Sequence, residues 1–147
     1  MPELAGALAL LAAAAFAGAA CYVSIAEHPA RMALDDGWAL RQWKPSYANG
    51  KIMQAALALI GALLAFWMWW EGRNLIWLIG GLALLANWPF TLAAIMPTNR
   101  RLEALSPDAP APETRALLIR WGRLHAVRAA LGGASALIMV CAFYCRL

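Results

Sequence analysis

The sequence predicts an all-α integral membrane protein built as an up-down four-helix bundle. Of its 147 residues, 63% are hydrophobic and only 14% are charged, which is more apolar surface than a soluble domain of this length can bury. Runs of about 18 or more apolar residues, long enough to cross a bilayer, occur four times in the chain. We expect one domain, with helices over residues 4–27, 50–70, 74–96 and 121–145 and long connections over residues 28–49 and 97–120.

The first helix begins with Glu3 as its only early charge. A secretory signal peptide begins with basic residues instead, so we expect this segment to be retained. Proline disfavours α geometry in the residue before it, and the helix should therefore end before Pro29. The second helix would place Tyr47, Lys51 and Gln54 on one face if it began that early.

The third helix contains Pro89, which frees a backbone carbonyl and predicts a kink. Asn87 and Thr91 lie one turn apart on the same helix and could join neighbouring helices by hydrogen bonds. The fourth apolar run is long enough to span only if His125 and Arg128 are tolerated in its first turns.

The positive charges predict the orientation. All twelve Lys and Arg residues except Arg73 and Arg146 lie in the long connections or at the helix ends beside them. The positive-inside rule places that side in the cytoplasm and both termini outside, and we expect the membrane to be a bacterial inner (plasma) membrane. The net charge of +4 is then explained by topology, without a nucleic-acid partner. The residues expected to form an aromatic belt at the opposite end are Trp67, Trp69, Trp70 and Trp77.

The three cysteines, Cys21, Cys141 and Cys145, give little indication of function. Two cysteines four residues apart on one helix are badly placed for a disulfide, and two thiols alone do not complete a metal site. We interpret them as small buried apolar residues.

Unusual polar residues converge at the end that carries the long connections. An up-down topology brings to this end the close of the first helix, the start of the second, the close of the third and the start of the fourth. The candidate site residues gathered there are Glu27, His28, Tyr47, Gln54, Asn99, Trp121, His125 and Arg128.

Trp121, His125 and Arg128 have the spacing i, i+4 and i+7, so they form one stripe on the fourth helix. At about 1.5 Å per residue, Arg128 lies roughly 10 Å deeper than Trp121. Because an arginine at a helix centre costs about 2.5–3.5 kcal/mol in lipid, we expect Arg128 to point into the bundle, with Glu27 as its counter-ion. Each residue taken alone also fits a structural role: Arg128 with Glu27 could fix two helices together, and His125 could simply donate a hydrogen bond. Together they favour a functional site, because ionisable residues within a membrane usually mark one.

Several segments resemble one known family of four-helix membrane proteins, the DUF1772 family, also called the anthrone oxygenase family. The matching segments, in the same order and at the same helix ends, are Gly18, VSIAEHPAR at 23–31, WKPSYANGKIMQ at 43–54, PTNRRL at 97–102 and WGRLHAVRAALGGAS at 121–135. The residues to which this resemblance points are Glu27, His28, Asn99, Trp121, His125 and Arg128.

The resemblance implies oxidation of an anthrone-like aromatic C–H group to a quinone by O2. A lipophilic aromatic small molecule would enter sideways from the bilayer. His125 or His28 would take the ring proton as general base, and Arg128 would stabilise the resulting anion. Asn99 and Gln54 would orient substrate carbonyls, and Trp121 and Tyr47 complete the expected substrate-binding set. The electron-rich anion could then reduce O2 without a cofactor.

Two other classes of function remain open. His28, His125 and Glu27 form a two-histidine, one-carboxylate set that suits iron, and copper, or a haem held by the two histidines, is the related alternative. A non-catalytic small transporter or assembly protein is the other class, although helices two to four carry no deep carboxylate. Small residues such as Gly122 and Gly133 could also pack a second copy of the chain, which leaves a homo-oligomer open.

Overall fold

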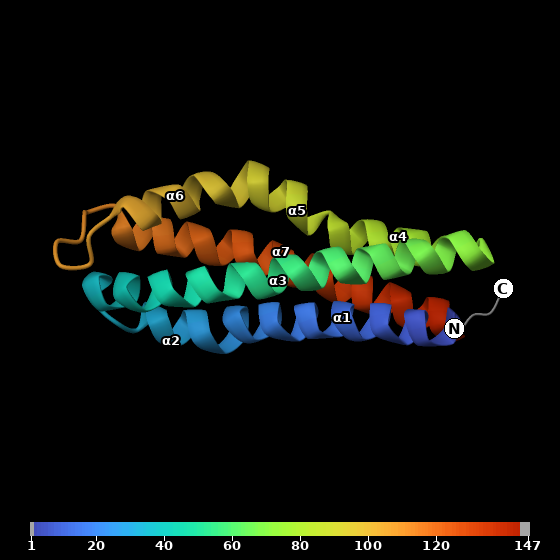
Figure 1. Cartoon of the computed structure of the whole chain (residues 1–147). Helices are drawn as coiled ribbons and strands as arrows, with labels where there is room; N and C mark the ends of the chain where they lie inside the picture. The colour runs from blue at the N-terminus through green and yellow to red at the C-terminus, as the bar shows by residue number, and fades with distance from the viewer. Residues whose placement is uncertain (1, 145–147) are drawn as a thin grey trace.

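The computed structural model describes residues 2–144, and the regular structure in that range is helical (Figure 1). Four long helical rods follow one another along the chain. In order, the segments are α1 (Pro2–Tyr22), η1 (Val23–Glu27) and α2 (His28–Met32) in the first rod, α3 (Asp36–Gly72) in the second, α4 (Leu75–Leu85), α5 (Asn87–Phe90), η2 (Thr91–Ile95) and α6 (Met96–Ala104) in the third, and α7 (Thr114–Tyr144) in the fourth.

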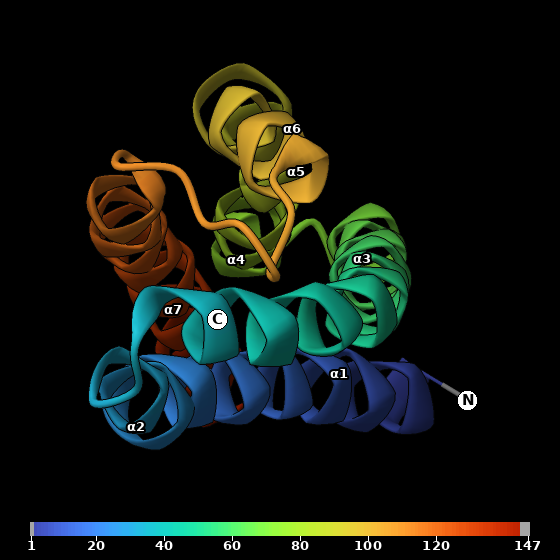
Figure 2. The same ribbon diagram turned by 90° about the vertical axis from the view of Figure 1, so that its left-hand side faces the viewer.

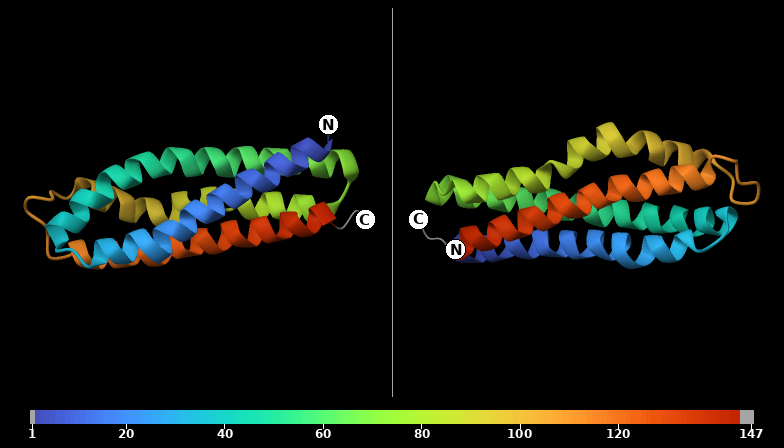
Figure 3. Two further views of the ribbon diagram at one scale, coloured as in Figure 1. Left: turned by 90° about the horizontal axis from the view of Figure 1, so that it is seen from below. Right: turned by 180° about the vertical axis from the view of Figure 1, so that it is seen from behind.

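The rods form a ring in which α1 packs against α3 and α7, and α4 packs against the same two helices. Successive rods run in opposite directions, as Figures 2 and 3 show. Each rod is long and apolar enough to cross a membrane. These observations confirm the predicted all-α, up-down four-helix bundle.

The helices are longer than the apolar runs that predicted them. Most of the expected connections, residues 28–49 and 97–120, are helical, and the links between rods at this end are residues 33–35 and 105–113. Helix α3 alone has 37 residues, which is about 55 Å at about 1.5 Å per residue, against about 30 Å for the hydrocarbon core of a bilayer. The start of α3 carries Asp36, Arg41 and Lys44. We therefore expect the end formed by α2, the start of α3, α6 and residues 105–113, called the loop end below, to project beyond the core.

The expectation that the first helix ends before Pro29 is wrong. The chain continues through the π-helix η1 into α2, and the amide of His28 donates to the carbonyl of Val23, five residues back. The same arrangement occurs before Pro97, where the amide of Met96 donates to the carbonyl of Thr91. A proline cannot donate and its ring clashes with the preceding turn, and the wider π turn accommodates it without ending the rod. The kink expected near Pro89 is present as the break between α4 and α5.

Small residues let the rods approach closely. A Cβ at Gly132 would lie 2.5 Å from the Phe16 ring, and one at Gly61 would lie 2.7 Å from Leu84. The hydroxyl of Ser135 donates to the carbonyl of Gly80 at 2.8 Å. This is the packing expected where helices associate in lipid, with small residues at the contact and polar side chains joining helices.

The aromatic belt at the opposite end is confirmed only in part. Trp67 and Trp70 are exposed, as interfacial residues should be, but Trp77 is only 4% exposed. Its indole lies against Gly6, where a Cβ would be 3.2 Å from the ring. Trp77 is therefore a core residue, because the glycine on α1 leaves room for the indole.

Cys21 is half-buried and Cys141 is exposed, and both are free thiols. The expectation that the cysteines are buried is therefore wrong for Cys141, which lies on the outer surface of α7. Cys145, and with it the expected end of the fourth helix, lies outside the described residues.

Arg115 joins the start of α7 to the link between α2 and α3 at the loop end. Its guanidinium donates to the carboxylate of Asp36 at 2.6 Å and to the carbonyls of Met32 and Leu34. The ammonium of Lys44 similarly donates to the carbonyls of Glu103 and Leu105. These contacts hold the start of α3 against its neighbours and position the polar residues beneath.

Candidate active site

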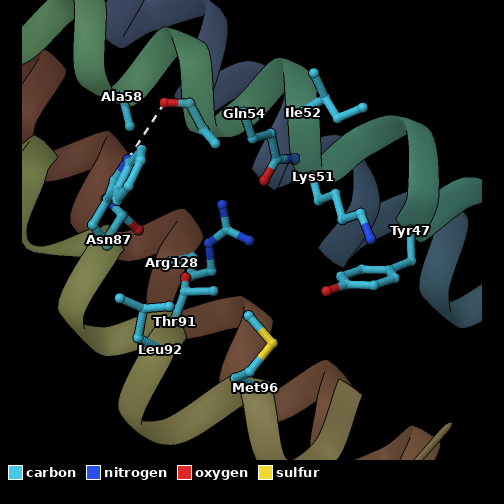
Figure 4. A pocket seen from close by; sticks show the side chains of 12 residues that line it. Tyr47, Lys51, Ile52, Gln54, Ala58, Asn87, Thr91, Leu92, Met96 and Arg128 are labelled. Carbon is cyan, nitrogen blue, oxygen red and sulfur yellow. Dashed lines mark hydrogen bonds between the residues drawn. The ribbon is translucent and has the colours of Figure 1, made fainter. Parts of the chain in front are cut away.

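Two adjoining pockets lie between α3, the third rod and α7. The larger, called the chamber below, has a volume of about 320 Å³. Apolar side chains form most of its wall, and polar groups from three helices reach into it (Figure 4). Its lining residues are Tyr47, Lys51, Ile52, Gln54, Ala55, Ala58, Asn87, Trp88, Thr91, Leu92, Met96 and Arg128.

The smaller pocket, called the inner pocket, has a volume of about 40 Å³ and is more polar. Trp121, His125 and Asn99 line it, and it shares Gln54 and Arg128 with the chamber. Of the eight predicted site residues, six line one or both pockets. Neither Glu27 nor His28, the remaining two, lines them.

Arg128 stands where the two pockets meet. Its guanidinium points into the chamber (Figure 4) and lies 5.5 Å from the ring of Phe16. Its buried Nε has no hydrogen-bond partner, and no ion pair within residues 2–144 includes it. The expected pairing with Glu27 is therefore wrong, and Arg128 presents an unneutralised charge to the cavity.

Glu27 pairs with Arg31 instead. Its carboxylate accepts hydrogen bonds from Arg31, from the hydroxyl of Ser46 and, at 3.1 Å, from the amide of Gln42. The side chain of Arg31 is 1% exposed, whereas in the sequence Arg31 was only one of the positive charges that predicted the orientation. The two residues are i, i+4 on a rod that continues through Pro29, and a helix that ended before Pro29 would not have joined them.

His125 has one ring nitrogen engaged. The hydroxyl of Ser24 donates to the carbonyl of Ala20 at 3.0 Å, and its oxygen lies 3.2 Å from Nδ1 of His125. With its hydrogen used on Ala20, the Ser24 oxygen accepts from Nδ1–H. Nε2 of the neutral ring then carries the lone pair, which is the state that a general base requires.

His28 packs behind this site. Its ring centroid lies 5.4 Å from that of Trp121, and the Trp121 indole stacks on His125 at 4.8 Å. A Cβ at Gly122 would lie 2.2 Å from Nε2 of His28. The contact with His28 depends on glycine at this position of α7.

We therefore expect Gly122→Ala to lower the free energy of unfolding by about 1–3 kcal/mol, the usual cost of overpacking, and to displace His28. Thermal unfolding in detergent, followed by circular dichroism, measures the change. Gly133→Ala is the matched control on the same helix, since a Cβ there meets nothing within 4 Å. Equal stability of the two variants would contradict the tight contact.

Asn99 and Tyr47 form a pair beside the inner pocket. One end of the Asn99 carboxamide donates to the Tyr47 hydroxyl at 3.0 Å, and the other end is buried without a partner. Tyr47 stacks on Trp43 at 4.8 Å. The conditional prediction that α3 starts early enough to place Tyr47, Lys51 and Gln54 on one face is confirmed by their shared place in the chamber wall.

Sequence reasoning did not include Asn87, Thr91 and Trp88 in the site, although all three line the chamber. The spacing of Asn87 and Thr91 was visible, but it fits a helix–helix contact equally well. Trp88 had no distinguishing pattern. Its indole donates to the carbonyl of Ala55 at 3.4 Å, so it joins the third rod to α3 at the chamber wall.

The metal-site alternative needs Glu27 beside both histidines. Glu27 is instead held by Arg31, Ser46 and Gln42. Within the described part of the chain, no three His, Cys, Asp or Glu side chains gather in a group that could hold a metal ion. The two-histidine, one-carboxylate set is therefore not assembled.

Comparison with known proteins identifies a family. A family model described as anthrone oxygenase matches residues 43–138, about two thirds of the chain. The matched region contains the chamber and most of the inner pocket, and it excludes Glu27 and His28. No curated protein and no solved structure matches the chain.

Proposed function

Because this chain belongs to the anthrone oxygenase family, also called DUF1772, we propose that it is a membrane-embedded oxidoreductase that uses O2 to oxidise a lipophilic phenolic aromatic molecule. The reaction takes place where the chamber meets the inner pocket, at the end that we expect to face the cytoplasm. The observation that carries this proposal is the juxtaposition of a neutral imidazole, His125, with an unpaired guanidinium, Arg128, beside an apolar cavity.

The first step is a proton transfer. Nε2 of His125 takes one proton from the ring CH2 of the substrate, and the electron pair of that C–H bond spreads through the fused rings onto the carbonyl oxygen opposite, which becomes a phenolate. The fixed charge of Arg128 stabilises this anion in a site from which the apolar wall excludes water. Ser24 keeps Nδ1 protonated, so Nε2 remains the accepting nitrogen.

The remaining steps use the substrate's own electrons. The anion gives one electron to O2, and the resulting carbon radical and superoxide combine to form a C–O bond. The peroxide takes the proton back from His125. Loss of the second C–H proton and cleavage of the O–O bond then release water and leave a carbonyl. The sum is CH2 plus O2 giving C=O plus H2O, and the scheme requires no bound cofactor.

The test is oxidation of an anthrone by the protein in lipid nanodiscs. Quinone absorbance and O2 uptake are followed together, and empty nanodiscs give the uncatalysed rate. We expect one O2 consumed per quinone formed, with no hydrogen peroxide released. Metal analysis and an optical spectrum of the same sample accompany the assay. A rate no greater than that of empty nanodiscs overturns the proposal, and stoichiometric iron, copper or haem overturns its cofactor-free scheme.

A further inference from the structure

Unpaired polar atoms are concentrated in the two pockets. Five buried side-chain nitrogen or oxygen atoms in residues 2–144 have no hydrogen-bond partner, and three of them belong to Arg128, Asn87 and Asn99. All three residues line the chamber or the inner pocket. Buried polar groups are normally hydrogen-bonded, and a cluster of exceptions around one cavity indicates that a ligand supplies the partners.

The charge of the cavity defines one part of that ligand. Arg128 brings a cation to which no carboxylate within residues 2–144 is paired. Lys51, the other cation of the wall, pairs at its exposed end with Glu103 at 3.7 Å. Because an uncompensated buried charge is costly, the cavity favours a ligand that brings a negative charge to Arg128.

The side-chain amides of Asn87 and Asn99 define a second part of the ligand. Asn87 uses one end of its carboxamide on the carbonyl of Leu84, and Asn99 uses one end on Tyr47. The unpaired atom of each amide is its carbonyl oxygen, an acceptor that is buried beside the cavity. A hydroxyl, which both donates and accepts, suits these positions.

The apolar walls of the chamber define the third part of the ligand. Ile52 on α3 and Leu92 on η2 border the chamber and are 70% and 60% exposed, on rods long enough to span a bilayer. The chamber wall is therefore exposed on the outside of the bundle at these two elements, where we expect it to meet lipid. Its apolar wall suits a planar aromatic body that partitions into the membrane.

We propose that the chamber selects the anionic form of a planar, hydroxylated aromatic molecule, with the negative group on Arg128 and a hydroxyl on Asn99 or Asn87. As a statement about the substrate this rests on the proposed function, because such an anion resembles the deprotonated substrate. As a statement about binding it is separate, and it is measured without turnover.

The experiment measures equilibrium binding of 6-hydroxy-2-naphthoate, a fluorescent planar anion, to the protein in nanodiscs of zwitterionic lipid. The neutral isostere 6-hydroxy-2-naphthamide and the unhydroxylated 2-naphthoate are measured alongside, and empty nanodiscs correct for partitioning. We expect the wild type to bind the hydroxynaphthoate at least about tenfold more tightly than the amide, which corresponds to about 1.4 kcal/mol, and more tightly than 2-naphthoate.

Arg128→Met should remove the preference for the anion, and Arg128→Lys, which keeps the charge, should retain part of it. Arg123→Met is the matched control, an exposed cation on the same helix, and should bind like the wild type. Equal binding of the carboxylate and the amide by the wild type overturns the inference, as does a preference that survives Arg128→Met. Anthrone oxidation without anion selectivity would leave the proposed function and remove this inference, whereas anion selectivity without oxidation would do the reverse.

Discussion

His125→Gln should lower the rate of anthrone oxidation roughly 10²- to 10⁴-fold, the usual contribution of a general base. Glutamine keeps the size and polarity of the side chain but cannot take a proton at neutral pH, so the loss should fall on kcat. The variant should still fold, because His125 makes only one hydrogen bond, to Ser24, within the described chain. Steady-state kinetics in nanodiscs, with unfolding measured on the same preparation, give both quantities.

Ser24→Ala provides a graded companion to that variant. It removes the acceptor that fixes Nδ1–H of His125, so kcat should fall by less than in His125→Gln while KM changes little. Ser24→Thr, which restores the hydroxyl, should recover the rate. If His125→Gln turned over as fast as the wild type, the base would have to be sought elsewhere, and a KM effect alone for Ser24→Ala would contradict its role in positioning the imidazole.

Glu27→Ala should lower the free energy of unfolding by about 3–5 kcal/mol, because it leaves the charge of Arg31 buried and unpaired. The double variant Glu27→Leu/Arg31→Met removes both charges and should recover most of this loss. Chemical or thermal unfolding in detergent measures the difference. The resulting double-mutant cycle isolates the coupling between the two side chains.

An exposed ion pair provides the control for this prediction. Lys51 and Glu103 lie 3.7 Å apart with side chains 47% and 45% exposed, and Glu103→Ala should cost no more than about 1 kcal/mol. If Glu27→Ala abolished turnover without changing stability, Glu27 would belong to the catalytic machinery, as the sequence pattern first suggested. A stability loss that the double variant does not recover would contradict the ion-pair explanation.

Much of the site could be predicted from helical geometry. Trp121, His125 and Arg128 share one stripe because 3.6 residues make a turn, and that stripe does line the two pockets. Asn99 and Gln54 were placed beside it by topology alone, since an up-down bundle brings alternate helix ends together. These inferences needed only periodicity and the order of the apolar runs.

The partners of the charges could not be predicted in the same way. The sequence analysis paired Glu27 with Arg128 alone, and the actual partner depended on whether the first rod crossed Pro29. The π turn at η1 lets it cross, which brings Glu27 within one turn of Arg31 and leaves Arg128 unpaired. A local backbone adjustment of this kind has no clear pattern in one sequence.

The sequence by itself determined that this is a membrane protein of four antiparallel helices with its polar residues at one end, because the length and order of apolar runs follow from the solvent that they must match. Only the tertiary structure decided that Glu27 pairs with Arg31 rather than Arg128, that Arg31 is buried and that Trp77 lies in the core. Those outcomes depend on how closely the rods approach and where they diverge. The approach is set by contacts between segments far apart in the chain, such as those of Gly6 and Gly122 with their neighbours. The divergence is set by the break between α4 and α5.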